Sequence, residues 1–318
     1  MKLSDYVMNF LFERKIAHIF GYQGGSITHL IDSLHKVKGL TYIQNYHEQA
    51  SAFCADAYAR VTGGVGVAIA TSGPGATNLI TGIANAFFDS VPCLFITGQV
   101  STHAIKTKPA IRQQGFQETD IVSIVKPLTK FAETVLKPEK IRFCLEKAFY
   151  RAQSGRPGSV LIDIPHNVQA SEVDPQALQS FYDSDEYAAE MKRQLQPDYN
   201  AVRQIVAMLA EAKRPVILAG GGMASVRGKG IFQTFVHNCD LPVVGSLRGL
   251  DALSHDEHFC GFIGSYGNRY ANFAVAKSDL LLVLGSRLDE RQTGDDRSLF
   301  ARGARIVHVD IDPDVLGY

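Results

Sequence analysis

Short apolar stretches alternate with longer stretches of helical spacing along almost the whole chain. In the first half, five stretches of strand length end in turn residues, at positions 16–25, 40–46, 66–75, 92–100 and 158–165. Helix-like stretches, in which apolar residues recur every three or four positions, lie at 27–37, 48–63, 75–89 and 139–154. Repeated strand, helix, strand units predict a parallel β-sheet with helices on both faces. We therefore expect an α/β fold with doubly wound parallel sheets.

The alternation occurs in two series, which predicts two domains in a chain of 318 residues. The first domain is expected over residues 1–168. Residues 169–196 are polar and acidic, and are expected to form a surface linker. Residues 197–318 predict a Rossmann-like second domain. Because the chain stops directly after its last strand-like run, we expect this domain to be incomplete at its C-terminus and the chain to be part of a longer polypeptide.

Composition excludes several classes of protein. The 32 basic residues balance the 32 acidic residues, so the chain has no electrostatic footprint for nucleic acid. Residues 61–88 carry no charge, but their glycines and Pro74 favour a buried core over a membrane span. The N-terminal stretch predicts an amphipathic helix and not a signal peptide. Five cysteines without a Cys-x-x-Cys pair favour a cytoplasmic protein whose partners are small molecules or further subunits.

A glutamate stands where a strand-like run changes into a helix-like one. Glu48 has apolar and small neighbours, and the positive end of the helix favours its carboxylate. Taken alone, this position is typical of a solvated helix cap. However, Ala52, Ala55 and Ala59 follow on the same helical face, and small residues let another backbone come close. We expect a tight helix–helix contact at this face, including one between subunits.

Two glycine-rich loops follow strand-like runs. Gly-Pro-Gly at 73–75 precedes an uncharged helix, and its glycines would let a ligand touch the backbone. As a bare pattern, it is more often a structural turn. Gly-Tyr-Gln-Gly-Gly at 21–25 holds the corresponding position after the first strand-like run. Together with Glu48, these loops are predicted to meet at the carboxyl edge of the sheet, where ligands bind in such folds.

Several long motifs in register carry a family resemblance. They are HEQA at 47–50, ATSGPGATNLITGIANAFFDSVP at 70–92, ITGQV, FQETDIV and GRPGSVLIDIP. On these, residues 1–168 resemble the pyrimidine-binding domain of thiamine diphosphate enzymes, and most of all that of the acetolactate synthase catalytic subunit. RPVILAGGG, GSYGNRYAN, LGSRLDERQTG and VHVDIDP resemble the central domain of the same enzymes. The diphosphate-binding domain, with its Gly-Asp-Gly motif for Mg²⁺, is absent from this sequence.

The resemblance implies an activity. The chain is expected to belong to a carboligase that decarboxylates a 2-oxo acid such as pyruvate and transfers the acyl carbanion to a second 2-oxo acid. The region around 113–118 lacks the adjacent histidines of simple pyruvate decarboxylases, which favours carboligation. Two alternatives stay open: a related thiamine diphosphate decarboxylase or carboligase of another pathway, and a non-catalytic subunit that needs a partner. The family also implies a homodimer or homotetramer, with Mg²⁺ bound through the missing domain.

The resemblance also implies roles for residues around the predicted rim. Glu48 would hydrogen-bond N1′ of the aminopyrimidine, so that the 4′ nitrogen can remove the proton from thiazolium C2. A pocket of low dielectric would let the glutamate share that proton. Pro74 and Asn78 would line the pyrimidine pocket. The residues that would face the reacting carbonyl are Gly25, Phe116 and Gln117.

The central domain of acetolactate synthases holds FAD that takes no part in the net reaction. The residues that the resemblance assigns to the flavin are Arg156, Gly220, Gly221, Gly222, Gly264, Gly267, Arg287, Arg291, Asp310 and Asp312. An alternative stays open, in which these glycines only form tight turns and the fold has lost its flavin.

Two positions depart from the family pattern. His166 replaces the usual lysine, and Ser265-Tyr266 replaces a methionine-histidine pair. Both positions border the substrate channel or the flavin, so a donor other than pyruvate fits the sequence as well. His255 and His258 are expected to be a solvated pair, and no metal site is predicted in this chain.

Overall fold

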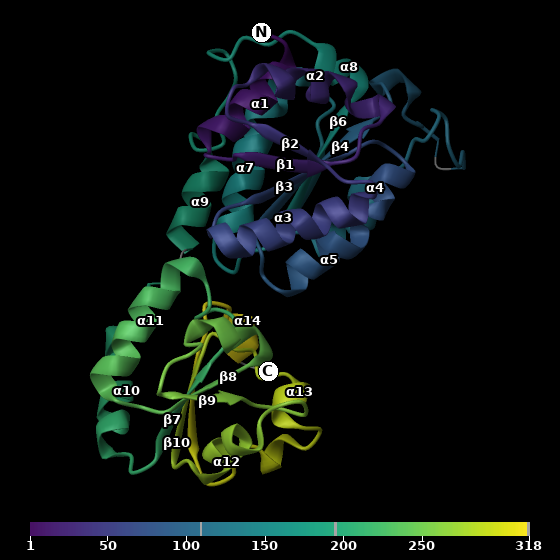
Figure 1. Cartoon of the computed structure of the whole chain (residues 1–318). Helices are drawn as coiled ribbons and strands as arrows, with labels where there is room; N and C mark the ends of the chain where they lie inside the picture. Colours follow the sequence, from purple (N-terminus) through teal and green to yellow (C-terminus); the bar gives the residue numbers. More distant parts are fainter. Residues whose placement is uncertain (109, 194–195, 317–318) are drawn as a thin grey trace. The chain divides into compact units, whose positions relative to one another are not determined.

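The computed structural model describes residues 1–108, 110–193 and 196–316. The chain forms two compact units, Met1–Gln194 and Leu195–Tyr318, which we call unit 1 and unit 2. Each unit has its own parallel sheet flanked by helices (Figure 1). The predicted α/β class with two doubly wound parallel sheets is confirmed.

The sheet of unit 1 has six strands in the order β2-β1-β3-β4-β6-β5, and all neighbours pair in parallel. The strands are β1 (His18–Gly21), β2 (Thr41–Gln44), β3 (Gly66–Ala70), β4 (Cys93–Gln99), β5 (Phe131–Thr134) and β6 (Ser159–Pro165). The central strands β3, β4 and β6 are buried along their whole length. Five of the six strands match the apolar stretches of the sequence, and β5 was not predicted.

Alternate side chains of these strands build a core on each face of the sheet. Val67 and Ile69 face a core covered by the helices α1 (Leu3–Glu13), α2 (Thr28–Lys36), α7 (Ile141–Gln153) and α8 (His166–Ala170). Ala68 and Ala70 face the opposite core, covered by α3 (Glu48–Thr62), α4 (Pro74–Asn78), α5 (Ile80–Phe88) and α6 (Ile121–Val125). Figure 1 shows α3 and α5 together on one side of the sheet and α1, α2 and α8 on the other.

The small-residue face of α3 packs inside unit 1. Ala52, Ala55 and Ala59 are all buried. A Cβ added to Gly82 of α5 would lie 2.3 Å from the Cβ of Ala52, and one added to Gly66 of β3 would lie 1.9 Å from the carbonyl oxygen of Ala55. The predicted close contact is therefore confirmed, but it joins α3 to α5 and to the sheet. This face is not available to another subunit.

Most of the stretch 169–196, predicted as a linker, packs against unit 1. Backbone hydrogen bonds join its start to the N-terminus of the chain, from Leu3 N to Ser171 O and from Val173 N to Met1 O. Phe181 is fully buried, and its ring contacts those of Phe143 and Tyr150. Residues 194 and 195 of this stretch lie outside the described residues.

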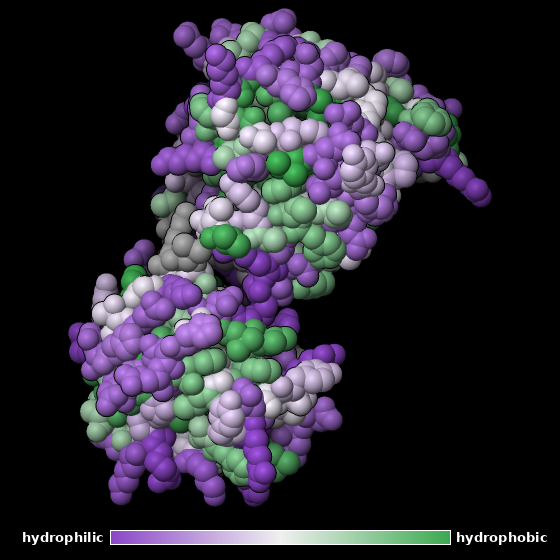
Figure 2. Space-filling view, in the orientation of Figure 1, coloured by the Kyte–Doolittle hydropathy of each residue, from purple (hydrophilic) through white to green (hydrophobic). Residues whose placement is uncertain are grey.

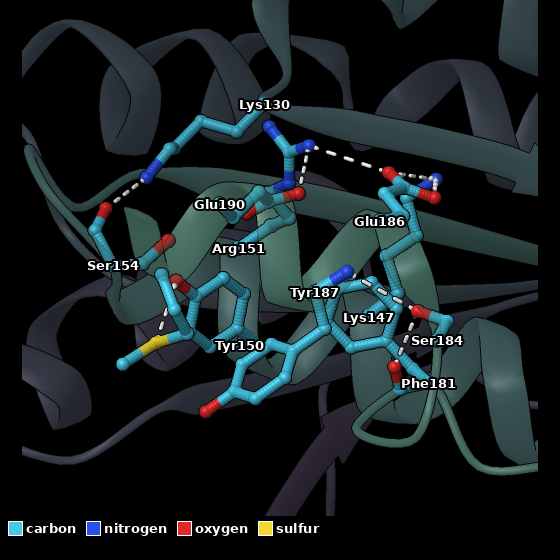
Figure 3. A network of polar contacts seen from close by, with 11 residues as sticks. Lys130, Lys147, Tyr150, Arg151, Ser154, Phe181, Ser184, Glu186, Tyr187 and Glu190 are labelled. Carbon is cyan, nitrogen blue, oxygen red and sulfur yellow. Dashed lines mark hydrogen bonds and ion pairs between the residues drawn. The ribbon is translucent and has the colours of Figure 1, made fainter. Parts of the chain in front are cut away.

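Helix α9 (Asp185–Arg193) continues this attachment through ion pairs. Glu186 lies 2.9 Å from Lys147 Nζ and 3.5 Å from Arg151 of α7, and Glu190 also pairs with Arg151. Figure 3 shows the two glutamates of α9 pointing toward the basic side chains of α7. The acidic composition of the stretch thus reflects ion pairing with α7, and a free surface linker does not describe it.

The sheet of unit 2 has five parallel strands in the order β11-β10-β7-β8-β9. The strands are β7 (Pro215–Ala219), β8 (Val243–Gly245), β9 (Phe259–Phe262), β10 (Leu280–Leu284) and β11 (Arg305–Val309). The helices are α10 (Tyr199–Glu211), α11 (Val226–Cys239), α12 (Arg269–Lys277), α13 (Glu290–Thr293) and α14 (Pro313–Leu316). Within the described part of the chain, no helix has the length and apolar character needed to cross a membrane.

Candidate active site

Glu48 is the first residue of α3 and lies just beyond the carboxyl end of β2. The preceding residue, His47, caps the helix through its ring, whose Nδ1 accepts a hydrogen bond of 3.1 Å from Gln49 N. His47 therefore supplies an acceptor for one of the N–H groups that the first turn of a helix leaves unpaired. Glu48 is only 7% exposed, so it is not the solvated cap that its position alone would suggest.

The carboxylate of Glu48 has one oxygen held by the protein. Asn78, the last residue of α4, donates from Nδ2 to Glu48 Oε2 over 2.9 Å. No donor in the described residues reaches the second oxygen, Oε1. Oε1 is not fully enclosed by the protein, so a carboxylate oxygen that can accept a hydrogen bond is left for a ligand N–H.

The Gly-Pro-Gly turn shapes the space beside Glu48. Pro74 begins α4, directly after Gly73, whose φ of 65° is strained for any residue with a side chain. A Cβ added to Gly75 would lie 2.7 Å from Thr71 Cγ2 and 3.1 Å from Glu48 Oε1. Any larger residue at 75 would therefore crowd the carboxylate, and glycine keeps the approach to Oε1 open.

Hydroxyl groups join the loop after β1 to the loop after β3. Ser26 Oγ lies 2.6 Å from Ser72 Oγ and 3.1 Å from Thr71 Oγ1, and Ser26 N donates to Thr71 Oγ1. A Cβ added to Gly25 would meet no atom within 4 Å, so this glycine borders open space. The two glycine-rich loops therefore meet at the carboxyl edge of the sheet, as predicted, and Glu48 lies at the same rim.

A third loop closes against the Gly-Pro-Gly turn. A Cβ added to Gly73 would lie 2.8 Å from both the Cβ and the carbonyl oxygen of Gln117, whose own φ is 62°. The neighbouring Phe116 is 85% exposed. Of the residues predicted to face the substrate, Gln117 thus packs on the turn and Gly25 borders the open rim, while Phe116 points its ring into solvent within unit 1.

Glu118 organises this third loop from the inside. It is buried, and its carboxylate accepts backbone N–H groups from Lys106 at 2.8 Å, Gln114 at 2.7 Å and Gly115 at 3.4 Å. Burial by itself raises the pKa of Glu118, but these N–H donors outweigh it and hold the pKa below its ordinary value. No residue pattern predicts this role, because the three donors are main-chain groups.

We expect Glu118→Gln to loosen the loop. The amide nitrogen of glutamine cannot accept, so at least one N–H loses its partner, at a local cost of about 1–3 kcal/mol. Trypsin should then cut faster after Lys106 or Arg112 in the variant than in the parent chain, with Glu172→Gln as an exposed control. Because the folded pKa is lowered, the parent loop should hold above the ordinary pKa of glutamate and loosen as the pH falls below it. Equal cleavage rates at neutral pH would contradict the role.

A buried aspartate that sequence analysis missed helps to fasten this loop to the sheet. Asp163 of β6 accepts hydrogen bonds from Thr97 Oγ1 at 2.7 Å, Gln99 Nε2 at 3.1 Å and Thr134 Oγ1 at 3.2 Å. Gln99 Nε2 also donates to Thr119 O over 2.7 Å. Burial raises the pKa of Asp163 to about 7, although the three donors act to lower it. The available signal was the polar residues within the otherwise apolar strands β4 and β6.

His166, the residue that departs from the family pattern, lies near the first glycine-rich loop. Its Nε2 is 3.2 Å from Thr28 Oγ1, and its ring centroid is 4.5 Å from that of His29. Thr28 Oγ1 in turn donates to Gly25 O over 3.3 Å. The pKa of His29 is lowered, first by burial and then by the charges of Lys2 and His166. A pair of histidines therefore stands beside Gly25 at the carboxyl end of β6.

Most of the residues assigned to a flavin lie beyond the carboxyl ends of strands in unit 2. The glycines at 220–222 follow β7, Gly264 and Gly267 follow β9, Arg287 and Arg291 follow β10, and Asp310 and Asp312 follow β11. Since the strands are parallel, all of them gather at one edge of the sheet. Arg156 lies elsewhere, in the turn before β6 of unit 1, where its Nε donates to Ser90 Oγ over 2.7 Å.

The glycines of this edge have a packing role of their own. A Cβ added to Gly220 would lie 2.0 Å from Gly285 O, and one added to Gly264 would lie 2.4 Å from Arg291 O. Both glycines are thus required by close contact between loops, without any ligand. A cleft of about 800 Å³ lies at this edge, lined by Arg287, Arg291 and Arg297 together with the acidic residues Asp289, Glu290, Asp295 and Asp314. The lining carries both signs of charge, with arginines that can contact an anionic ligand, and the glycines by themselves do not require a ligand.

The chain is similar to known proteins in both units. Residues 1–124 match the family model of the thiamine pyrophosphate enzyme N-terminal TPP binding domain, and residues 202–318 match the model of the central domain. Thiamine pyrophosphate is another name for thiamine diphosphate. Acetolactate synthase large subunits from Cyanidium caldarium and Haemophilus influenzae are 39% and 38% identical over 315 residues, which is 98% of this chain and 52% of each relative.

The same subunit from Lactococcus lactis is 38% identical over 320 residues, or 99% of this chain and 53% of the relative. The chain therefore spans about half the length of the curated relatives it matches. Both family models describe consecutive parts of one kind of enzyme, and they match in the expected order. The chain belongs to the thiamine pyrophosphate enzyme family and contains its N-terminal and central domains.

Proposed function

We propose that this chain contributes the pyrimidine-binding half of the active site of a thiamine diphosphate-dependent carboligase resembling acetolactate synthase. The observation that carries the proposal is the carboxylate of Glu48, which is buried, held by Asn78 at one oxygen and without a protein donor in the described residues at the other. Under this proposal, the domain that binds the pyrimidine ring lies in residues 1–168, and the following stretch up to Arg193 packs onto it. Residues 197–318 form the Rossmann-like central domain.

The residues around Glu48 fit an aminopyrimidine ring. Glu48 Oε1 can exchange a proton with a ring nitrogen, and Asn78 keeps the carboxylate in position through Oε2. Pro74 and the glycines beside it offer a flat wall without side chains that would block the ring. When bound, thiamine diphosphate supplies the electron sink that lets a 2-oxo acid lose CO₂ and join a second carbonyl compound. The chain's own part is to hold the ring and to move its proton at Oε1.

The substrates proposed are small 2-oxo acids. Gly25 and Gln117 border the rim beside the turn, and Phe116 is free to cover a substrate. The pair of His166 and His29 beside Gly25 would distinguish this site from one with a lysine there. Because a histidine in place of the lysine presents a different side chain to the rim, the donor need not be pyruvate, and a related decarboxylase or carboligase is the second candidate.

Other parts of the active site are proposed to come from outside this chain. The sequence has no Gly-Asp-Gly motif, so Mg²⁺ and the diphosphate would be held by a further part of the polypeptide or by a partner chain. On its own, the chain would then be inactive. FAD is proposed for the carboxyl edge of unit 2, supported by Arg287 and Arg291 at the cleft. An absorption spectrum of the intact protein would reveal a flavin.

A homodimer or homotetramer in the cytoplasm completes the proposal. Apolar residues are exposed near the rim and on its flanking helices, among them Tyr46, Phe53 and Phe116. In Figure 2, apolar surface gathers over the region of α3 and α5. Such surface suits contact with a second protein surface. The five cysteines, which all lie in described parts of the chain, are unpaired, as suits a reducing compartment.

The test is the product formed from pyruvate. The intact protein, supplied with thiamine diphosphate and Mg²⁺, should release CO₂ and form acetolactate. Release of acetaldehyde instead would assign it to the decarboxylases. Condensation of another 2-oxo acid would assign it to a carboligase of a different pathway. If no 2-oxo acid reacts and the cofactor does not bind, the proposal fails and a non-catalytic subunit is the remaining interpretation.

A further inference from the structure

A cluster of four polar side chains lies in unit 2, away from the carboxyl edge. His237 stands in the last turn of α11, and Asp240 is the C-cap of that helix. Asp256 and His258 stand in the turn that precedes β9. The sequence suggests a pair formed by His255 and His258, but the fold brings His258 next to His237 instead, with 5.3 Å between ring centroids.

The ligand atoms of three of these residues converge. His237 Nε2 lies 2.7 Å from Asp256 Oδ2, and His258 Nδ1 lies 2.8 Å from Asp256 Oδ1. The two imidazoles and the carboxylate keep their ligand atoms within 4.8 Å of one another. The remaining nitrogen, His258 Nε2, lies 3.0 Å from Asp240 Oδ1.

We propose that His237, Asp256 and His258 form a binding site for a divalent transition metal, with Zn²⁺ as the ion of choice. Two imidazole nitrogens with one carboxylate suit zinc, and a set of hard oxygen ligands for Ca²⁺ or Mg²⁺ is not present here. Three protein ligands leave a fourth position for water. The half-exposed ring of His237 lets the ion enter from solvent.

Asp240 supplies an outer partner, by which we mean a carboxylate that does not touch the metal but accepts a hydrogen bond from a histidine that does. A histidine that ligates a metal through one nitrogen donates its other N–H to a carboxylate, which fixes the ring. Asp240 is placed to accept from His258 Nε2 in this way, while Nδ1 faces Asp256 and the ion. Bound metal would join the end of α11 to the start of β9. The inference does not depend on the proposed function.

The same contacts could also be made without a metal. His258 would then have to donate from both ring nitrogens, to Asp256 and to Asp240, and the cluster would act only as a clamp between two segments. The two explanations differ in what happens when zinc is added, because the clamp alone predicts no uptake.

The experiment is a calorimetric titration of the chelator-treated chain with ZnCl₂. We expect one Zn²⁺ per chain and a higher unfolding temperature with zinc. His237→Ala removes an exposed ligand and should weaken binding by more than about 100-fold, since loss of an outer partner alone costs 10–100-fold. Co²⁺ should give visible absorption bands in the parent chain and lose them in this variant.

Two further variants serve as an outer-partner test and a control. Asp240→Gly removes the outer carboxylate at a position with φ 51°, where glycine is favoured, and should weaken zinc binding by about 10–100-fold with the fold intact. His255→Asn removes an exposed histidine of the same turn at φ 63°, which asparagine tolerates, and should bind zinc like the parent. Absence of zinc uptake by the parent chain, or equal uptake by His237→Ala, would overturn the site.

Discussion

Glu48→Gln should lower the turnover of the intact enzyme by about 10²- to 10⁴-fold, the range expected when a positioned acid or base is lost. Glutamine has the shape of glutamate, and its amide oxygen can still accept from Asn78 Nδ2, so the local structure should remain. The amide nitrogen that replaces Oε1 can donate a hydrogen bond but cannot give up or take a proton. The loss should therefore fall on the proton transfer and leave folding unchanged.

The direct measurement is the rate at which the C2 proton of the bound cofactor exchanges with deuterium, followed by NMR. Exchange should slow in parallel with turnover, while circular dichroism stays the same. Glu139→Gln, at an exposed glutamate of unit 1, is the matched control and should exchange like the parent. Normal exchange in Glu48→Gln would remove this glutamate from the mechanism and, with it, the main support for the proposed function.

Asp163→Asn should stabilise unit 1 at pH 8 and change it little at pH 4. The pKa of the buried aspartic acid is raised to about 7, so between pH 4 and pH 7 the folded state keeps a proton that the unfolded state has released. The stability of the parent therefore falls as the pH rises through this window. The difference between about 7 and the ordinary value near 4 corresponds to roughly 4 kcal/mol at most.

Asparagine fits this position without loss of hydrogen bonds. Its amide oxygen can keep the donors Gln99 Nε2 and Thr134 Oγ1, and its amide nitrogen can donate to the hydroxyl of Thr97. Calorimetric unfolding of both chains at several pH values gives the stability difference directly, and this difference should grow from pH 4 to pH 7. Asp163→Ala is the contrasting variant: it leaves buried donors unpaired, at about 1–3 kcal/mol each, and should destabilise at every pH. If the stability difference between Asp163→Asn and the parent does not change with pH, the pKa of Asp163 is not raised in the folded state.

Strands that show an apolar run, and the loops that follow them, could be predicted from the sequence. Glu48 and the Gly-Pro-Gly turn each follow an apolar strand, and parallel strands place their carboxyl ends at one edge, so their meeting follows from pattern alone. The strands β5 and β9 have no such signal, because FAET and FCGF are too short and mixed to show an apolar run. Both lie at sheet edges, where less burial is required.

The contacts that hold the rim in place could not be predicted in the same way. The carboxylate of Glu118 binds main-chain N–H groups, which have no residue signature. Asp163 meets Gln99 only because β4 and β6 are neighbours in the sheet, and the sequence does not state strand order. Likewise, His258 lies next to His237 only because α11 packs beside the turn before β9.

The attachment of α9 to α7 determines where the first unit can be cut from the rest. A piece ending at residue 168 would lack Phe181 and leave its aromatic neighbours on α7 uncovered in water. It would also strip Lys147 and Arg151 of their acidic partners. An N-terminal fragment that contains unit 1 should therefore extend through Arg193 to stay in solution. We expect shorter fragments to aggregate.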